Sequence, residues 1–259
     1  MKSAKVLVLG GISESLDLTA GLWKKGFQVL VSRATDVYQN EQSLPGVIFR
    51  HGSLSRVDLE NLARRENISA IIDCTHPFAT QISWNAHQTA VNLSLPFLVY
   101  DRPSLDPDAL GIHRARDHHQ GADLTLAREE VVFLSIGSNN IRIYADKAGK
   151  MRTRLAARVL PGKVFKNKCL DAGLKEERII QARGPFSVHE NIGHFQSVDA
   201  GCLVTKDSGE AGGVPAKLEA ARILGIRVVM INRPPRPGRL KFDRIDELIR
   251  AVEQSLGGH

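Results

Sequence analysis

The segment Thr205-Lys206-Asp207-Ser208-Gly209-Glu210-Ala211-Gly212-Gly213 is the part of this chain best suited to binding an anion. It follows a short apolar run and precedes a helical pattern that opens at Val214-Pro215. Its hydroxyls, its lysine and its backbone amides can donate hydrogen bonds, while its glycines leave room for a bulky ligand. A flexible loop without a ligand is the less favoured interpretation, because unused glycines would only raise the entropy lost on folding.

A second anion-binding candidate is the turn Leu9-Gly10-Gly11-Ile12-Ser13-Glu14 near the N-terminus. Two glycines let the backbone approach a phosphate, and a helix that begins near Ser13 points its amides at it. The turn lacks the full G-x-G-x-x-G fingerprint, since Ile12 and Ser15 occupy the later glycine positions. A phosphate site is favoured over a plain tight turn, but this motif alone is weak.

Two further strand ends carry side chains of interest. Ser32-Arg33 has no acid to accept the ribose hydroxyls of NAD, and an arginine there suits the extra phosphate of NADP. A solvated loop arginine is the alternative, and the nearby Asp36 keeps NADH open. In Asp73-Cys74-Thr75-His76-Pro77-Phe78-Ala79, the proline opens a helix and leaves Thr75 and His76 at the sheet edge. His76 is a proton donor or a structural hydrogen-bonding group, and both interpretations stay open.

The remaining strand-end candidates are Ser135-Ile136-Gly137-Ser138-Asn139 and Arg183-Gly184-Pro185-Phe186-Ser187. Other chemistries lack their motifs. The chain has no His-Glu-x-x-His sequence and no paired cysteines, and Asp117-His118-His119 falls in a loop or at a helix start, so we expect no metal site. The G-x-S-x-G elbow of hydrolases and the phosphate loop of nucleotide triphosphatases are also missing from the sequence.

Composition limits the class of protein. Of the 259 residues, 42% are hydrophobic and 24% charged, which is typical of a globular chain, and the net charge is +7. Only 5% of residues are aromatic and the basic residues are dispersed, so a small polycarboxylate explains the charge as well as DNA would. The densest basic stretch, Lys147 to Arg158, is either a solvated edge or an anion-binding rim. No apolar run reaches membrane length and the three cysteines lie far apart, which favours a cytoplasmic protein without disulfides.

Short apolar runs alternate with helical patterns along the whole chain, as in βαβ units around parallel sheets. Expected helices include one through Ile12, Leu16, Thr19, Ala20 and Trp23 that ends at Gly26, one capped by Ser55 and Asp58, one through Ile82, Ala86, Thr89, Ala90 and Leu93, and those at Val214–Leu224 and Asp243–Leu256. The expected strands are Val6–Leu9, Phe27–Ser32, Val47–Arg50, Ala70–Cys74, Phe97–Tyr100, Val131–Ile136, Thr153–Val159, Arg178–Ala182, Cys202–Thr205 and Arg227–Ile231.

The proline-rich stretch after Tyr100, from Asp101 to Pro107, indicates that the chain leaves the first sheet there. We therefore expect an α/β fold of two doubly wound, Rossmann-like domains, residues 1–102 and 103–259, with a cleft between them. In such sheets ligands bind beyond the carboxyl ends of the strands, so the loops above would face the cleft.

Taken together and in order, these segments resemble those of precorrin-6A reductases, the pyridine-nucleotide-dependent enzymes of cobalamin biosynthesis. The resemblance covers nearly the whole chain. It is carried by Gly10-Gly11-x-x-Glu14, Asp73-x-Thr75-His76-Pro77-Phe78-Ala79, Gly184-Pro185-Phe186-Ser187, and Thr205-Lys206-Asp207-Ser208-Gly209 leading to Lys217-Leu218-Glu219-Ala220-Ala221. The chain departs from the family pattern at Ile12, Cys74, Ile136 and Glu210; the first and third remove hydroxyl donors, and Glu210 adds a negative charge beside an anion.

The resemblance implies two flavodoxin-like domains and hydride transfer from NADPH, or from NADH in some relatives, to a macrocycle double bond, giving precorrin-6B. The implied partner is a polycarboxylate tetrapyrrole-derived substrate, with no nucleic acid and no membrane. His76 or a water would supply the proton, and Lys206 would assist. Cofactor contacts are expected from Gly10, Gly11, Ser13, Glu14, Ser32, Arg33, Thr75, Gly137, Ser138, Gly184, Thr205, Lys206, Ser208 and Gly209, and substrate contacts from Pro77, Phe78, Arg102, Arg183, Pro185 and Phe186.

Two alternatives remain from sequence alone: an adenosylmethionine-dependent methyltransferase of a tetrapyrrole pathway, and a non-catalytic dinucleotide-binding or nucleic-acid-binding module. The choice between metal-free and cobalt-containing substrate, the preferred nicotinamide, and the oligomeric state also stay open.

Overall fold

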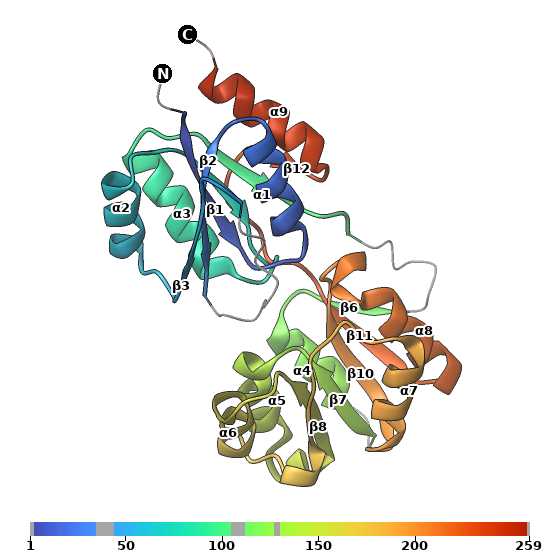
Figure 1. The fold of residues 1–259 in the computed structure, drawn as a ribbon. Helices are drawn as coiled ribbons and strands as arrows, with labels where there is room; N and C mark the ends of the chain where they lie inside the picture. The colour runs from blue at the N-terminus through green and yellow to red at the C-terminus, as the bar shows by residue number, and fades with distance from the viewer. Residues whose placement is uncertain (1–2, 35–43, 105–111, 127–129, 258–259) are drawn as a thin grey trace. The chain divides into compact units, whose positions relative to one another are not determined.

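The structure is a computed structural model that describes residues 3–34, 44–104, 112–126 and 130–257. The chain divides into two compact units, of which unit 1 comprises residues 1–103 and 235–259 and unit 2 comprises residues 104–234. Each unit is an α/β sandwich in which helices cover both faces of a six-stranded parallel sheet (Figure 1). Within the described residues, no helix is both long and apolar enough to cross a membrane.

Unit 1 alternates strands with helices and is completed by the C-terminal segment. Its elements are β1 (Lys5–Gly10), α1 (Glu14–Lys24), β2 (Gln28–Arg33), β3 (Val47–His51), α2 (Arg56–Arg65), β4 (Ile68–Cys74), α3 (Thr80–Asn92), β5 (Phe97–Tyr100), β12 (Leu240–Phe242) and α9 (Ile245–Leu256).

Unit 2 is built in the same way. Its elements are β6 (His113–Ala115), α4 (His118–Leu126), β7 (Val131–Ser135), α5 (Ile141–Ala148), β8 (Leu155–Val159), α6 (Lys163–Asp171), β9 (Ile179–Gln181), α7 (Val188–Gln196), β10 (Ala200–Lys206), α8 (Val214–Leu224) and β11 (Arg227–Ile231).

The strand orders of the two sheets are equivalent. Unit 1 has the order β12-β5-β4-β1-β2-β3, and unit 2 has β6-β11-β10-β7-β8-β9. Apart from the edge strands β12 and β6, the five strands of each sheet, numbered along the chain, follow the Rossmann order 3-2-1-4-5, not the flavodoxin order 2-1-3-4-5. The expected doubly wound, Rossmann-like fold is therefore confirmed, while the expected cleft stays a prediction. The order reverses between β1 and β4 in unit 1, and between β7 and β10 in unit 2.

Alternation along the buried strands creates the two halves of the unit 1 core. Val6 and Val8 point into one cluster with residues of α1 and α9, whereas Leu7 and Leu9 point into the opposite cluster with residues of α2 and α3. Each of these four strand side chains is at most 1% exposed. Burial on both faces explains why the parallel strands read as continuous apolar runs.

The second expected domain, residues 103–259, needs correction at its C-terminal end. The boundary after Arg102 agrees with the end of the first segment at Pro103, but the chain returns to unit 1 at Pro235. There β12 pairs with β5, and α9 buries Leu248, Ile249 and Val252 beside α1. A Cβ at Gly21 of α1 would collide with the side chain of Ile249, so this glycine permits the close approach of the two helices.

The helix at Val214–Leu224 is confirmed, and Ser55 and Asp58 form a complete capping box. The strand expected from Thr153 begins at Leu155, after a 3-10 segment. The face predicted for α1 is partly wrong, because Leu18 and Leu22 are the large apolar side chains of that helix that are fully buried.

Candidate functional site

Unit 1 gathers its candidate loops at the carboxyl ends of β1, β2 and β4. Gly10 packs so tightly that an added Cβ would lie 3.3 Å from Ser15 Oγ and 3.4 Å from the side chain of Arg33. A Cβ on Gly11 would meet the backbone nitrogen of His76 at 3.4 Å. Neither glycine has a positive φ, so close approach of neighbouring segments, not a left-handed turn, explains the two glycines. The structure thus brings together Gly10, Gly11, Arg33 and Thr75-His76, while their predicted contacts with a cofactor stay a prediction.

Arg33 ends β2 beside this glycine turn. Arg33 is 3% exposed, and its guanidinium lies over the Phe49 ring, 5.2 Å from the ring centroid. Its neighbour Ser32 is also buried and accepts a hydrogen bond from Arg50 at 2.9 Å. Asp36, which kept NADH open in the sequence, lies outside the described residues.

The start of α1 carries an ion pair instead of an unpaired acid. Arg102 contacts Glu14 at 2.5 Å, with side chains 5% and 17% exposed, and Ser13 also donates to this carboxylate at 2.7 Å. Arg102 was expected to bind substrate, and this role stays a prediction because the structure holds the side chain against Glu14. The pair neutralises the negative charge at the turn proposed to hold a phosphate, so Glu14 does not oppose anion binding there.

A buried network organises the loop after β4. The Asp73 carboxylate accepts from the Thr75 amide at 3.1 Å, from the Thr75 hydroxyl at 2.6 Å and from Ser83. Arg236, from the returning C-terminal segment, pairs with Asp73 at 2.7 Å and donates to the Tyr100 carbonyl at 3.0 Å. Asp73 is fully buried, so an opposite charge in contact is required. Sequence reasoning missed Arg236 because its position in unit 1 depends on the chain return.

His76 follows this network and is half-buried. Its Nδ1 accepts a hydrogen bond from the Phe78 amide at 3.2 Å, which assigns the ring proton of the neutral imidazole to Nε2. The His76 and Phe78 rings lie 5.8 Å apart, and Pro77 between them is buried. The local structure therefore fixes a donor at Nε2.

Unit 2 gathers cations at the corresponding sheet edge. Lys206 ends β10, Lys217 lies in the first turns of α8, and Arg158 lies on β8. Burial lowers the pKa of Lys206 to about 8. Burial, followed by repulsion from Arg158 and Lys206, lowers the pKa of Lys217 to about 7. Because the charges of Arg158 and Lys206 both act on Lys217, the three cations lie close enough to repel one another, and an anion bound among them would relieve that repulsion.

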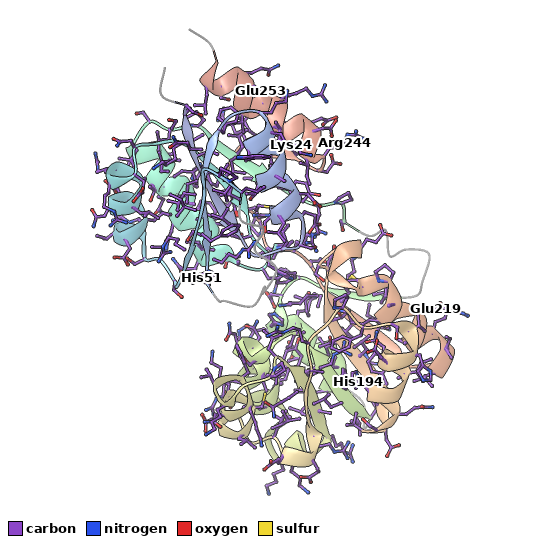
Figure 2. All side chains as sticks on the ribbon, viewed as in Figure 1. Lys24, His51, His194, Glu219, Arg244 and Glu253 are labelled. Atoms are coloured by element: carbon purple, nitrogen blue, oxygen red, sulfur yellow. The ribbon has the colours of Figure 1, made fainter. Side chains whose placement is uncertain are left out.

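Arg158 is the best supported member of this cluster. Its Nη1 lies 2.9 Å from Asn191 Oδ1 and 2.9 Å from His194 Nδ1, and its guanidinium lies 4.0 Å from the centroid of the Phe186 ring. Burial lowers the pKa of Arg158 to about 10. Figure 2 shows the side chains and labels His194 on α7. Phe186, predicted to touch substrate, thus packs against a cation of the cluster.

The other predicted residues of unit 2 also lie near carboxyl ends of strands. Gly137 and Ser138 follow β7, while Arg183, Gly184 and Pro185 are exposed between β9 and α7. Ser208 and Gly209 are buried after β10, and Thr205 is fully buried within it. Glu210, the departure that would place a negative charge near an anion, is exposed. Lys217 belongs to one of the family-like motifs but was not predicted as a site residue. The available signal was its position two residues after the proline that opens the helix.

His118 adds a neutral imidazole beside Lys206. It opens α4, its Nδ1 lies 3.3 Å from Tyr144 Oη, and burial together with the Lys206 charge lowers its pKa to about 4. Within the described residues, no group of three or more His, Cys, Asp or Glu side chains could hold a metal ion.

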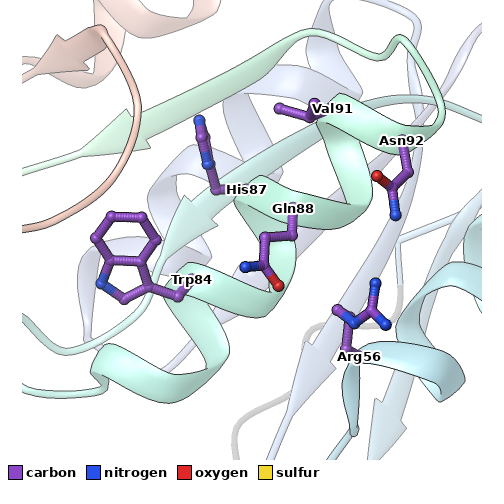
Figure 3. Close-up of a pocket in the computed structure, with 6 residues that line it drawn as sticks. All are labelled: Arg56, Trp84, His87, Gln88, Val91 and Asn92. Atoms are coloured by element: carbon purple, nitrogen blue, oxygen red, sulfur yellow. The ribbon is translucent and has the colours of Figure 1, made fainter.

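Two surface pockets lie away from these strand ends. One, of about 670 Å³, lies on α3 and the start of α2 and is lined by Arg56, Trp84, His87, Gln88, Val91 and Asn92 (Figure 3). The other, of about 510 Å³, lies at the amino ends of β10 and β11 and is lined by Phe195, Gln196, Asp199, Ala200, Leu224 and Ile226. Neither contains a residue predicted from the sequence to bind cofactor or substrate.

Comparison with known proteins agrees with this arrangement. The sequence profile of the family described as precorrin-6x reductase CbiJ/CobK matches residues 5–253. A precorrin-6A reductase of Rhodococcus erythropolis is 34% identical over 261 residues, covering 96% of each chain. A cobalt-precorrin-6A reductase of Priestia megaterium is 28% identical, covering 95% of this chain and 97% of the relative.

Among solved structures, that of CobK precorrin-6A reductase is 27% identical and aligns with a TM-score of 0.77, covering 98% of this chain and 97% of that chain. The resemblance first noted in the strand-end motifs therefore extends over both units. The chain belongs to the precorrin-6x reductase CbiJ/CobK family.

Proposed function

We propose that this protein reduces a double bond of precorrin-6A, or of its cobalt form, to give precorrin-6B, with NADPH as the hydride donor. The observation that carries the proposal is the cluster of Arg158, Lys206 and Lys217 in a chain of this reductase family. A substrate with many acetate and propionate groups would be attracted to these three cations.

The residues of unit 1 fit a dinucleotide. Gly10 and Gly11 lie between the ends of β1 and β4, which is the switch point where Rossmann sheets bind nucleotides. A Cβ on Gly10 would crowd Ser15 and Arg33, so glycine lets these two side chains pack closely against the turn. Arg33 occupies the end of the second strand, where a guanidinium can pair with the extra phosphate of NADPH. Gly10, Gly11 and Arg33 would hold this cofactor.

The residues of unit 2 fit the carboxylates of the substrate. Lys206 and Lys217 supply ammonium groups, and Ser208, two residues after Lys206, supplies a hydroxyl. Arg158 is held by Asn191 and by the Phe186 ring, so its guanidinium keeps one orientation. A fixed arginine loses less conformational entropy when it binds a carboxylate than a mobile one does. Arg183 stays a predicted substrate contact.

NADPH supplies the hydride when it is bound, and reduction of the double bond also consumes one proton. His76 is suited to deliver that proton, because the Phe78 amide occupies Nδ1 and leaves Nε2–H as the donor. Asp73 and Arg236 support this function indirectly by fixing Thr75, the residue next to His76.

The test is an anaerobic incubation of the protein with NADPH and precorrin-6A, in which NADPH absorbance and the macrocycle spectrum are followed together. We expect both to change at one rate, and parallel reactions with NADH and with the cobalt macrocycle define the preferences. A further reaction contains adenosylmethionine without NADPH. Methyl transfer in that reaction would show that the proposal is wrong. The same conclusion would follow if NADPH absorbance stayed constant with both macrocycles.

A further inference from the structure

Asp207 is a buried carboxylate inside the most glycine-rich ligand loop. It lies between Lys206 and Ser208 and is 2% exposed. Its Oδ2 accepts a hydrogen bond from Ser104 at 2.5 Å and lies 3.8 Å from Arg114. Its Oδ1 pairs with Arg233 at 3.3 Å, and its backbone carbonyl accepts from Arg233 Nε at 3.0 Å. The whole polar surface of Asp207 is therefore used inside unit 2.

These partners lie where the chain enters and leaves unit 2. Ser104 is the first residue of the unit, and Arg233 is the last but one. Arg114 reinforces the arrangement, because it donates to Asn232 Oδ1 at 2.8 Å. The Asp207 amide also donates to the Ile231 carbonyl at 3.0 Å. The Asp207 side chain thus connects residues near both ends of unit 2, Ser104 and Arg233, to the β10–α8 loop, residues 207–213.

We propose that Asp207 is a positioning residue that fixes the β10–α8 loop so that Lys206 and Ser208 meet an anionic group of the substrate. The inference deepens the proposed function and rests on it. Asp207 would not touch the substrate, since its oxygens are occupied by Ser104, Arg114 and Arg233. Its effect on binding would pass through the backbone that it shares with Lys206 and Ser208.

The direction in which the affinity for an anion changes in Asp207→Asn distinguishes a positioning role from a purely electrostatic one. Asp207→Asn removes a negative charge next to Lys206, and electrostatics alone would make anion binding tighter. The same change weakens the contacts to Ser104 and Arg233 and loosens the loop, which would make binding weaker. Weaker binding by a more positive site is the signature of positioning.

The experiment compares wild type with Asp207→Asn, Ser104→Ala and Glu130→Gln, all as full-length protein. Glu130→Gln is the control, because Glu130 accepts from Arg227 Nε at 2.8 Å in the same unit, beside the start of β11 and away from the strands' carboxyl ends. Each protein is titrated with uroporphyrin, a tetrapyrrole octacarboxylate, and its unfolding midpoint and amide hydrogen exchange are measured. KM and kcat for precorrin-6A are measured in parallel.

We expect Asp207→Asn to raise the Kd for uroporphyrin and the KM about tenfold, equivalent to the loss of about one good hydrogen bond, with kcat within about twofold of wild type. Ser104→Ala keeps the charge and should weaken binding about threefold. Exchange of the amides in residues 207–213 should accelerate in both variants. Glu130→Gln should lower the unfolding midpoint without changing Kd or loop exchange.

Unchanged or tighter uroporphyrin binding by Asp207→Asn would overturn the positioning role, as would wild-type exchange rates in residues 207–213. Failure of the proposed function is distinguishable, because it would appear in the wild-type protein as absent turnover of precorrin-6A. The exchange measurement tests the loop in either case.

Discussion

Anion binding by unit 2 should weaken steeply as pH rises through 7, because Lys217 must be protonated to bind. Burial and the charges of Arg158 and Lys206 lower the pKa of free Lys217 to about 7. A bound carboxylate stabilises the ammonium form and returns this pKa toward its usual range. Binding therefore takes up a proton above pH 7, so affinity is complete below that pH and is lost above it.

The size of the effect follows from the fraction of free Lys217 that is protonated. With a pKa of about 7, roughly one molecule in eleven carries the charge at pH 8 and one in a hundred at pH 9. The Kd for a polycarboxylate should therefore rise about 100-fold between pH 6 and pH 9 from this group alone. Lys206, with a pKa of about 8, should add about another tenfold by pH 9.

Uroporphyrin titrations at constant ionic strength check this prediction, since the carboxylates of the ligand stay ionised throughout that range. Lys217→Gln should bind weakly at pH 6 and should keep only the shallower decline that belongs to Lys206. A wild-type Kd that is constant from pH 6 to pH 9 would refute the reasoning. The same conclusion would follow if Lys217→Gln retained the full wild-type pH dependence.

Three further predictions concern unit 1. Arg33→Ala should lower the ratio of kcat/KM for NADPH to that for NADH by about tenfold or more, because one charge-assisted contact is lost. An unchanged ratio would show that Arg33 does not bind the extra phosphate of NADPH. His76→Ala should lower kcat about 100-fold and leave the Kd for NADPH within about twofold, and an unchanged kcat removes His76 from proton delivery. Arg236→Met should leave the buried Asp73 charge without its partner and lower the free energy of unfolding by about 3–5 kcal/mol, measured by urea denaturation against Arg244→Met on the exposed surface.

The long strands were predictable from sequence because burial on both sheet faces requires uninterrupted apolar runs. The edge strands β6 and β12 were missed, since neither contains two adjacent apolar residues other than alanine, whereas the equally short edge strand β9 contains Ile179-Ile180 and was predicted. Edge strands pair on one side only and need no long apolar run. Periodicity located α1, but Leu16 and Leu18 both allow an apolar face, and only packing against the sheet and α9 selects Leu18.

The return of the chain to unit 1 was not predicted because local patterns carry no information about distant pairing. The segment Arg233-Pro234-Pro235-Arg236 was an available signal, since it resembles the proline-rich exit after Tyr100. Strand-end loops were recognised by their glycines and hydroxyls. Arg158 was noted only as the end of a basic stretch that is either a solvated edge or an anion-binding rim, and Lys217 only within a motif, because they lie inside a strand and a helix, where sequence alone does not tell which side chains converge.

Asp73 and Asp207 have similar roles near corresponding strand ends of the two sheets, although the sequence shows no repeat. Asp73 is the last residue but one of β4 in unit 1, and Asp207 directly follows β10 in unit 2; each of these strands lies beside the switch point. Each aspartate is buried, fixes the loop that follows it, and pairs with an arginine of the segment Arg233-Pro234-Pro235-Arg236. Arg233 is held within unit 2 and Arg236 within unit 1, on the two sides of the point where one unit ends and the other resumes. Each loop is thus held by an arginine at one end of that segment, and each arginine also donates to a backbone carbonyl, Arg233 to that of Asp207 and Arg236 to that of Tyr100, so it contacts both the aspartate and the neighbouring backbone.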